Sequence, residues 1–586
     1  MTVSNYERFR AAPFTQPAHY PIEAKPDPAC YRPAAPWIGR LILPAFEDRL
    51  PDRGVFFEVE HAPAVHAGLI GRIVELGWDD DPVVQARVWG VTRDVRFTDR
   101  ARQSAANGVV HPERLDQWPL VGPLESLAGS HPVDDVIVAL PEPVVVDGDT
   151  PRLTIAREPV QITGRSVGLV RFLGPAEGVP DGYRVRHFSL ASRTFDGPEE
   201  TVLLPAVVLD SNDTAPFTND GIERSPLDDG GWYVYGALDA AGAFVVQALA
   251  PRALFQLRPD EVRFGADAAW RYVHSEMWKD AAKKKGTISS VLVAGAEVTP
   301  EAAVAAWQEG DRALLFHTFG GIGGKKREPA ARAILYWGHF AFGEATVVHE
   351  PLADELRFDI VYHQVYTHNP DGLIAGALHW SRYLGDRQFG WAGLRPTGDV
   401  LIKWDPFTEP YDFGFAERSG IGDVVAALEA MEARYRIGDG TGGTYVGAAN
   451  NCAQDSAAAF YAAIRRLDLD VSDRPRLQAW AEREPTEAAR LREGLMIGPA
   501  LRKRMSPLGT REDWQYDSSS LELSQQDGLL RGLARGFQSW RTMLPRLAAE
   551  TIAREFIRRG ADVWVLRTNQ IGGDDPDIAP IAPLTL

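Results

Sequence analysis

Short runs of β-branched and aromatic residues, separated by Gly, Asp and Pro clusters, fill the first 250 residues of the chain. Such runs predict short strands. A hairpin is expected where Trp232–Gly236 and Ala243–Leu249 flank an Asp-Ala-Ala-Gly turn. No GxGxxG or GxxxxGK[ST] motif occurs here, so the pattern favours small β-barrels or sandwiches over a doubly wound sheet. The other strands expected are Val55–Val59, Leu69–Leu76, Val83–Val91, Val160–Leu173, Tyr183–Phe188 and Thr201–Val208.

The pattern changes near residue 298, where Thr299 and Pro300 predict the start of a helix. Thr is a good N-cap residue, and Pro is favoured at the first helical position. The strands expected after this point are Arg312–Phe316, Ala333–Phe342, Ala345–Glu350, Leu356–Tyr366, Asp399–Trp404 and, near the end, Asp562–Arg567. The helices expected from apolar spacing are Val424–Arg436, Cys452–Leu467, Pro475–Arg483, Thr486–Arg504, Ser520–Leu544 and Ala548–Arg559.

The segment Val424–Arg436 has a clear helical spacing. Apolar residues recur at intervals of three and four positions and so share one face of a helix. That face comprises Val424, Leu428, Met431 and Tyr435, whereas Glu429, Glu432 and Arg436 fall off it.

These patterns predict a multidomain α+β protein. A chain of 586 residues exceeds what one hydrophobic core usually serves, so several domains are expected. The expected parts are an extended, proline-rich arm at 1–36, a β-rich module at 37–150, a second β-rich module at 151–265, a mixed α+β domain at 266–470 and a helical C-terminal region at 471–586.

Composition excludes several classes of function. The net charge is −18, whereas a nucleic-acid binder normally presents a basic face, so no nucleic-acid partner is expected. No run approaches the ~18 apolar residues of a transmembrane segment, and the N-terminus lacks a signal-peptide core. We therefore expect a cytoplasmic protein of bacterial type. Two cysteines cannot build a disulfide framework or a four-cysteine zinc site, and no HExxH motif occurs, so neither a metal nor a cofactor is expected.

Cys452 is the candidate nucleophile. It follows Asn450 and Asn451, which are good N-cap residues, and it begins an apolar helix. Unpaired N–H groups and the helix dipole at such a position favour the reactive thiolate over the thiol. The alternative is that Cys452 is a small buried core residue, as most free cysteines are.

His339 is the candidate general base. It lies in a predicted strand between Gly338 and Gly343, whose missing side chains leave one side of the imidazole uncrowded. Other histidines cluster in the same part of the chain, and we interpret His317 and His379 among them as structural. The cluster also includes His349, His363 and His368.

Four short motifs together resemble the circularly permuted papain-like superfamily, which includes NlpC-type peptidases and lecithin:retinol acyltransferase-like enzymes. The motifs are Gly310-Asp311 before a strand, Gly338-His339-Phe340-Ala341, Val347-Val348-His349-Glu350, and Asn451-Cys452 at a helix start. The resemblance covers residues ~300–470. It implies a papain-like domain in which the His strand precedes the Cys helix, with Cys452 as nucleophile and His339 as its base.

The resemblance also implies a third polar residue that orients His339, normally on the strand after it. This sequence departs from that pattern and leaves His368, His363 and Glu350 open, with His368 preferred because it follows a strand end. Asn451, Gln364 and Trp391 are expected to contact substrate. Trp391 belongs to an aromatic loop with Tyr383 and Phe389 that either lines a substrate groove or packs over the sheet.

The predicted function is a cysteine-dependent hydrolase or acyltransferase, such as a thiol protease or amidase. It would act on the amide, ester or thioester carbonyl of a peptide or acyl-containing substrate. The N-terminal β modules are expected to bind substrate or a protein partner. The whole chain also resembles uncharacterised bacterial proteins, and the alternative is a non-catalytic multidomain adaptor in a bacterial stress or defence system.

Overall fold

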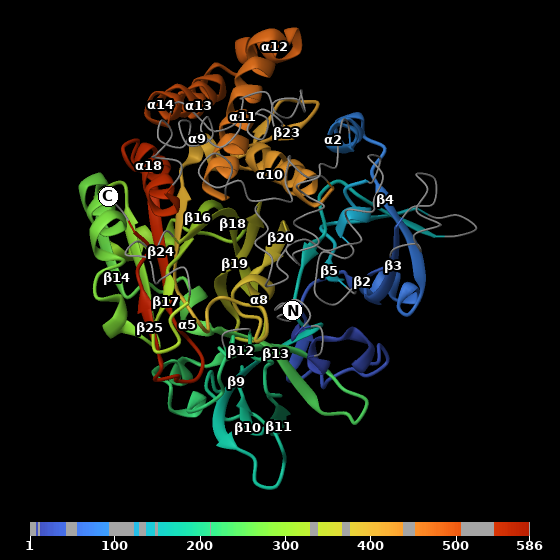
Figure 1. The fold of residues 1–586 in the computed structure, drawn as a ribbon. Coiled ribbons are helices and arrows are strands. Elements are labelled where there is room, and N and C mark those ends of the chain that lie inside the picture. The colour runs from blue at the N-terminus through green and yellow to red at the C-terminus, as the bar shows by residue number, and fades with distance from the viewer. Residues whose placement is uncertain are drawn as a thin grey trace, which may run out of the picture.

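The computed structural model describes residues 8–9, 12–42, 55–92, 122–127, 136–146, 151–210, 213–328, 338–365, 375–437, 452–505 and 544–584. Within these ranges the protein is mixed α and β, as predicted, with a 15-stranded sheet, a 6-stranded sheet and helices packed against them (Figure 1). None of the helices in the same ranges combines the length and the apolar character that crossing a membrane requires.

The central part of the large sheet contains a strand from the far end of the chain. In spatial order this part comprises β14 (Glu261–Phe264), β15 (Thr287–Ala294), β24 (Asp562–Asn569), β21 (Pro396–Lys403), β16 (Arg312–Phe319), β18 (His339–Glu350), β19 (Glu355–Gln364) and β20 (Gly376–His379). β24 pairs antiparallel with β15 on one side and with β21 on the other. Its Trp564 is fully buried and meets Trp307 and Phe358 edge to face. The C-terminal strand is therefore part of the core.

Strands from the first 161 residues extend the same sheet beyond β20. In spatial order they are β8 (Val160–Gln161), β5 (Val136–Ala139), β2 (Ile38–Ile42), β3 (Val55–His61), β4 (Ile73–Trp78), β7 (Arg152–Ile155) and β6 (Val144–Val146). β8 joins β20 through one parallel pairing, between Gln161 and Leu378. The extension has a hydrophobic cluster of its own that includes Trp37 and Phe57. Its backbone continues the sheet while its side chains form a separate small core.

The strand expected at Val83–Val91 is a helix in the structure, α2 (Pro82–Thr92). Pro82 occupies the first helical position, and the Asp81 carboxylate accepts hydrogen bonds from the backbone N–H groups of Val83 and Val84. These are the contacts of an N-cap residue. The strand prediction was wrong here because a cap and a proline outweigh β-branched composition.

The smaller sheet closes on itself. Its order is β1 (Tyr31–Pro33), β9 (Ser166–Pro175), β10 (Gly182–His187), β11 (Glu199–Leu203), β13 (Phe244–Pro251) and β12 (Trp232–Leu238), and β12 pairs again with β9. β12 and β13 form the predicted antiparallel hairpin. The single run expected at Val160–Leu173 is divided between β8 and β9, because Gly164 between them adopts a positive φ of 80°.

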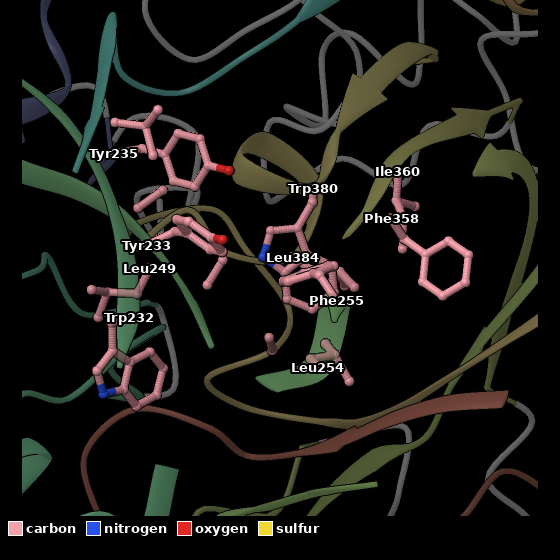
Figure 2. Close-up of a cluster of buried hydrophobic side chains, with 14 of the residues drawn as sticks. Trp232, Tyr233, Tyr235, Leu249, Leu254, Phe255, Phe358, Ile360, Trp380 and Leu384 are labelled. Atoms are coloured by element: carbon pink, nitrogen blue, oxygen red, sulfur yellow. The ribbon is translucent and has the colours of Figure 1, made fainter. Parts of the chain in front are cut away.

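Aromatic and aliphatic side chains join the small sheet to the large one (Figure 2). Trp232 and Leu249 of the hairpin belong to the same buried cluster as Phe358 of β19. Trp380 meets Phe255 edge to face at 4.9 Å. These two residues lie in the short helices α8 (Trp380–Tyr383) and α5 (Arg252–Phe255). Burial of large apolar side chains is the main stabilising contribution to such a layer, and here it fixes the position of α8 against the sheet.

Helices α10 (Gly420–Ile437), α11 (Cys452–Asp473) and α18 (Pro545–Ile557) pack against the central strands. Phe460 of α11 stacks on Phe342 of β18 with ring centroids 5.0 Å apart. The helices α12 (Pro475–Arg483), α13 (Pro485–Leu495) and α14 (Ile497–Met505) follow at the end of the molecule opposite the small sheet (Figure 1). The helix expected at Ser520–Leu544 lies outside the described residues, except for Leu544.

Short elements connect these parts. The helical ones are α6 (Ala266–Arg271), α7 (Pro300–Ala305) and α9 (Asp405–Thr408). The paired strands are β17 (Gly321–Gly324) with β25 (Ile578–Ile581), and β22 (Tyr411–Asp412) with β23 (Glu417–Arg418).

The charged side of α10 is buried against the N-terminal strands. Val424, Leu428 and Met431 are fully buried on the apolar side, as their spacing predicts. On the other side, Glu429 and Arg436 are also buried and are bound by ion pairs at 2.8 Å and 2.7 Å. Their partners are Arg157 and Glu158, which directly precede β8. Tertiary partners therefore replace water around these charges.

Replacing Gly236 of β12 by Ala is expected to destabilise the small sheet. An added Cβ would lie 1.9 Å from the carbonyl oxygen of Val245 on β13, so the paired backbones must move apart. Overpacking of this kind costs about 1–3 kcal/mol, which urea denaturation will measure. Gly68→Ala is the matched control, because its added Cβ meets nothing within 4 Å. Equal stability of the two variants would contradict the close approach of β12 and β13.

Candidate functional site

Cys452 is the first residue of α11 and lies beside the start of β18. The backbone N–H groups of Phe340, Ala453 and Cys452 itself lie close enough to the Cys452 sulfur to lower its pKa. Phe340 directly follows His339 in the chain. The structure thus brings together the Cys helix and the His strand, which the sequence separates by more than 100 residues.

Burial dominates the chemistry of the thiol. Cys452 is 7% exposed and belongs to the apolar cluster between the helices and the sheet. This burial raises the pKa of Cys452 to about 11, although the nearby N–H groups of Phe340 and Ala453 act in the opposite direction. Since an acid with this pKa is protonated at neutral pH, Cys452 rests as a thiol and requires a base to become a nucleophile.

His339 is held by Gln364. The imidazole Nε2 of His339, at the first position of β18, lies 2.8 Å from Oε1 of Gln364, at the last position of β19. An amide oxygen only accepts hydrogen bonds, so Nε2 is the donor. Both side chains are buried. Gln364, predicted to contact substrate, is therefore a hydrogen-bond partner of the His339 imidazole.

Tyr383 joins the same group from α8. Its hydroxyl donates to Oε1 of Gln364 at 3.4 Å. Burial raises the pKa of Tyr383 well above its usual value, and the nearby Cys452 thiolate would raise it further. The phenol therefore stays protonated. The sequence placed Tyr383 only within an aromatic loop, because nothing local indicates that α8 meets the ends of β18 and β19.

A buried polar pair, Asp399 and His317, lies next to the Tyr362 ring that packs on Tyr383. Asp399 of β21 lies 2.5 Å from Nδ1 of His317 and accepts a hydrogen bond of 2.6 Å from the hydroxyl of Tyr362. The rings of Tyr362 and Tyr383 pack with centroids 4.6 Å apart. His317 is thus part of a buried polar group next to the site, which agrees with its interpretation as a structural residue.

Aromatic rings and a cation cover the other side of His339. Phe319 of β16 stacks on the imidazole with centroids 4.9 Å apart, and Trp391 tilts against Phe319 at 5.1 Å. The Arg395 guanidinium lies over both of these rings and is bound to the Glu328 carboxylate at 2.7 Å. Trp391, predicted to contact substrate, is therefore one ring removed from His339.

The other candidates for the third polar residue lie elsewhere or outside the description. Glu350 is at the opposite end of β18 from His339, roughly 35 Å away along an extended strand, and it is bound by Arg32 and Arg357. His363 precedes Gln364 and so faces the other side of the sheet, where its Nδ1 donates to Glu432 at 3.1 Å. His368 and Asn451 lie outside the described residues.

The raised pKa of Cys452 predicts how alkylation will depend on pH. In a Cys30→Ser variant, Cys452 is the single remaining thiol. Iodoacetamide labelling is then expected to accelerate about tenfold for each pH unit from 7 to 10, because only the thiolate reacts and the pKa is about 11. Mass spectrometry of timed samples measures the rate. A rate already at its plateau below pH 8 would contradict the raised pKa.

Comparison with protein-family models, curated proteins and solved structures gives no match to this chain. In the part of the chain that the structure describes, no three His, Cys, Asp or Glu side chains gather closely enough to hold a metal ion. What the site can do must therefore be argued from the geometry of Cys452, His339, Gln364 and Tyr383.

Proposed function

We propose that the chain is a cysteine-dependent hydrolase or acyltransferase with Cys452 as nucleophile and His339 as general base. The observation that carries the proposal is the position of Cys452 at the first residue of α11, a helix that packs on β18, the strand that begins at His339. The hydrogen bond from His339 to Gln364 is the second support, since catalytic bases are commonly oriented by a third polar group.

The order of elements is consistent with a permuted papain-like domain. The strand that begins at His339 precedes the helix that begins at Cys452, and the two pack directly on each other. In this proposal Gln364, rather than His368, His363 or Glu350, orients the imidazole. It lies on the strand that follows the His strand, where the resemblance expects that residue.

The hydrogen bond to Gln364 determines which imidazole nitrogen acts as the base. Because Nε2 of His339 donates to Gln364, Nδ1 carries the lone pair in the neutral ring. As substrate binds, Nδ1 would take the thiol proton and the thiolate would attack an amide, ester or thioester carbonyl. The backbone N–H groups of Cys452 and Ala453, which lie near the sulfur at the start of α11, would stabilise the oxyanion. His339 would then protonate the leaving group, and water or an acceptor would release the acyl group.

One observation favours the second candidate, a non-catalytic adaptor. Cys452 belongs to a large apolar cluster, whereas the contacts of His339 with Phe319 and with Gln364 involve a different set of side chains. A thiol buried in this way, with a raised pKa, is also what a structural core residue shows. The two candidates differ in whether an acyl group can reach the sulfur of the folded chain.

Reaction with two electrophiles tests the proposal. The Cys30→Ser chain is incubated at pH 7.5 with a peptidyl acyloxymethyl ketone, which alkylates a thiolate and releases a carboxylate, and, separately, with an alkyl β-lactone, which a thiolate opens to a thioester; modified residues are mapped by mass spectrometry. We expect modification of folded Cys452 and none in Cys452→Ala. The preferred probe would indicate a peptide or a lipid-like acyl substrate.

The unfolded chain is the control for accessibility. Modification of Cys452 that occurs only in urea, at the rate of a free cysteine, would overturn the enzyme proposal and favour the adaptor. Faster modification in the folded than in the unfolded chain cannot come from a buried structural thiol, so this ratio separates the two candidates.

A further inference from the structure

A cavity of about 420 Å³ lies beside the small sheet, and the side chains of Cys452, His339 and Gln364 do not line it. Its walls come from the turn between β9 and β10 and from residues on either side of 210, at 206–207 and 215–220. Tyr183, Phe217 and Thr218 contribute both apolar and hydroxyl surface. Cavities of about 300–1,000 Å³ are the usual size of small-molecule sites.

The buried Arg387 side chain is part of the lining of this cavity. Arg387 is 1% exposed. Its Nη1 donates to the carbonyl of Val246 at 3.0 Å, and its Nη2 donates to the carbonyl of Pro205 at 2.6 Å. Nη2 also donates to Oδ1 of Asn219 at 3.0 Å, and the Asn219 side chain is itself part of the cavity wall.

Arg387 has no carboxylate bound to it among the described residues, and in the same part of the chain its Nε has no hydrogen-bond partner. The adjacent Asp386 is committed elsewhere, since its Oδ2 binds Arg382 at 2.8 Å. Burial lowers the pKa of Arg387 to about 10. A buried cation without a bound anion is costly, so an anionic group that reached it would be strongly attracted.

Two carboxylates stand at the rim of the cavity. Asp181 and Asp220 line it and are exposed to solvent. Within the ranges that the structure covers, neither side chain makes a hydrogen bond or ion pair. Asp181 is near enough to Arg387 to raise the pKa of its guanidinium, against the effect of burial. The lining of the cavity therefore combines one buried cation with two exposed carboxylates.

We propose that this cavity binds a compact zwitterion, with the ligand's carboxylate towards Arg387 and its ammonium group towards Asp181 and Asp220. The ligand would be a free amino acid or a very short peptide, whose ammonium and carboxylate groups lie close together. This site is separate from Cys452, and the proposal does not depend on the function proposed above.

Asn219 provides the route to the buried cation. A carboxylate that enters the cavity would replace the Asn219 amide oxygen on Nη2 of Arg387. The exchange is favourable because a hydrogen bond between a guanidinium and a carboxylate is roughly twice as strong as one to a neutral oxygen. Asn219 is half-buried, and its Nδ2 donates to the carbonyl of Leu204 at 3.0 Å, so the exchange must also release or keep that hydrogen bond.

Titration calorimetry of the full chain tests this site with four probes. L-alanine and glycylglycine are zwitterions, whereas acetate and methylamine each carry half of the pattern. We expect each zwitterion that binds to do so at least about tenfold more tightly than either half-ligand, and to raise Tm. Binding of L-alanine alone would identify free amino acids as the ligand class, and binding of glycylglycine alone would identify short peptides.

Variants at the rim locate the site without disturbing the fold. In Asp181→Asn/Asp220→Asn the zwitterion is expected to bind about tenfold more weakly while acetate binds as before or better. Asp80→Asn, which replaces an exposed acid elsewhere, should change nothing. The proposal is overturned if neither zwitterion gives heat or a rise in Tm at about 50 mM, or if the double variant binds both zwitterions like the parent.

Discussion

Replacing His339 by Ala is expected to slow acylation of Cys452 by about 10²–10⁴-fold, measured with the alkyl β-lactone at pH 7.5. The physical reason is the resting state of the thiol, whose pKa of about 11 leaves it protonated near neutral pH. Removal of the thiol proton by a positioned base contributes a factor of this size. The loss should shrink as the pH approaches 11, because hydroxide then supplies the thiolate.

His349→Ala is the matched control for this prediction. His349 lies on the same strand as His339, but it is exposed near the far end and pairs with Asp354. Its loss should leave acylation unchanged. Equal rates for the parent, His339→Ala and His349→Ala at pH 7.5 would show that His339 is no base for Cys452.

Variants at Gln364 distinguish the orientation of the His339 base from its mere presence. Gln364→Ala removes the acceptor of the His339 Nε2 proton and should slow acylation, whereas Gln364→Glu keeps an acceptor oxygen at that position. Without this acceptor, the neutral ring can carry its proton on Nδ1. That nitrogen then cannot accept the proton of the thiol. Recovery by Glu but not by Ala would support an orienting role for Gln364.

Replacing Arg436 by Met is expected to lower the free energy of unfolding by about 3–5 kcal/mol at pH 8. Arg436 and Glu158 form an ion pair of 2.7 Å in which both side chains are buried. Without the guanidinium, the Glu158 carboxylate would be left uncompensated in the interior. Urea denaturation at fixed pH measures the loss, and Arg193→Met, which replaces a largely exposed side chain, is expected to change stability by less than about 0.5 kcal/mol.

The effect of Arg436→Met should depend on pH, and its sign follows from Glu158. Burial raises the pKa of Glu158 to about 8, although Arg436 acts in the opposite direction. A carboxyl with a raised pKa stabilises the fold fully below its unfolded pKa of about 4.5, and this contribution is lost as the pH rises through 8. The loss caused by Arg436→Met should therefore be smaller at pH 5.5 than at pH 8. A Glu158→Gln change in the same chain should restore part of the stability, and a loss that is independent of pH would contradict this account.

Local signals determined several elements of this protein. Val424, Leu428 and Met431 recur at helical intervals, and the structure buries all three on one side of α10. The Asp-Ala-Ala-Gly turn after Trp232–Gly236 produced the predicted hairpin of β12 and β13. Such elements follow from residues close together in the chain, since spacing and turn chemistry act over a few positions.

The candidate site was predictable only in part. Cys452 does begin a helix and His339 does lie in a strand, because both follow from local pattern, although the predicted strand Ala333–Phe342 did not begin at His339. The choice among His368, His363, Glu350 and Gln364 depends on which strand ends adjoin His339. Side chains alternate between the two faces of a sheet, so a shift of one position along β19 exchanges His363 for Gln364.

The sequence by itself determined the class of fold and the local frames of Cys452 and His339. Only the tertiary structure decided that β24 from the C-terminus lies between β15 and β21, and that Glu429 and Arg436 are buried against Arg157 and Glu158. The physical reason is that strand order and buried ion pairs depend on partners hundreds of residues away. No period or cap in the sequence carries that information, because these contacts are chosen when the whole core packs.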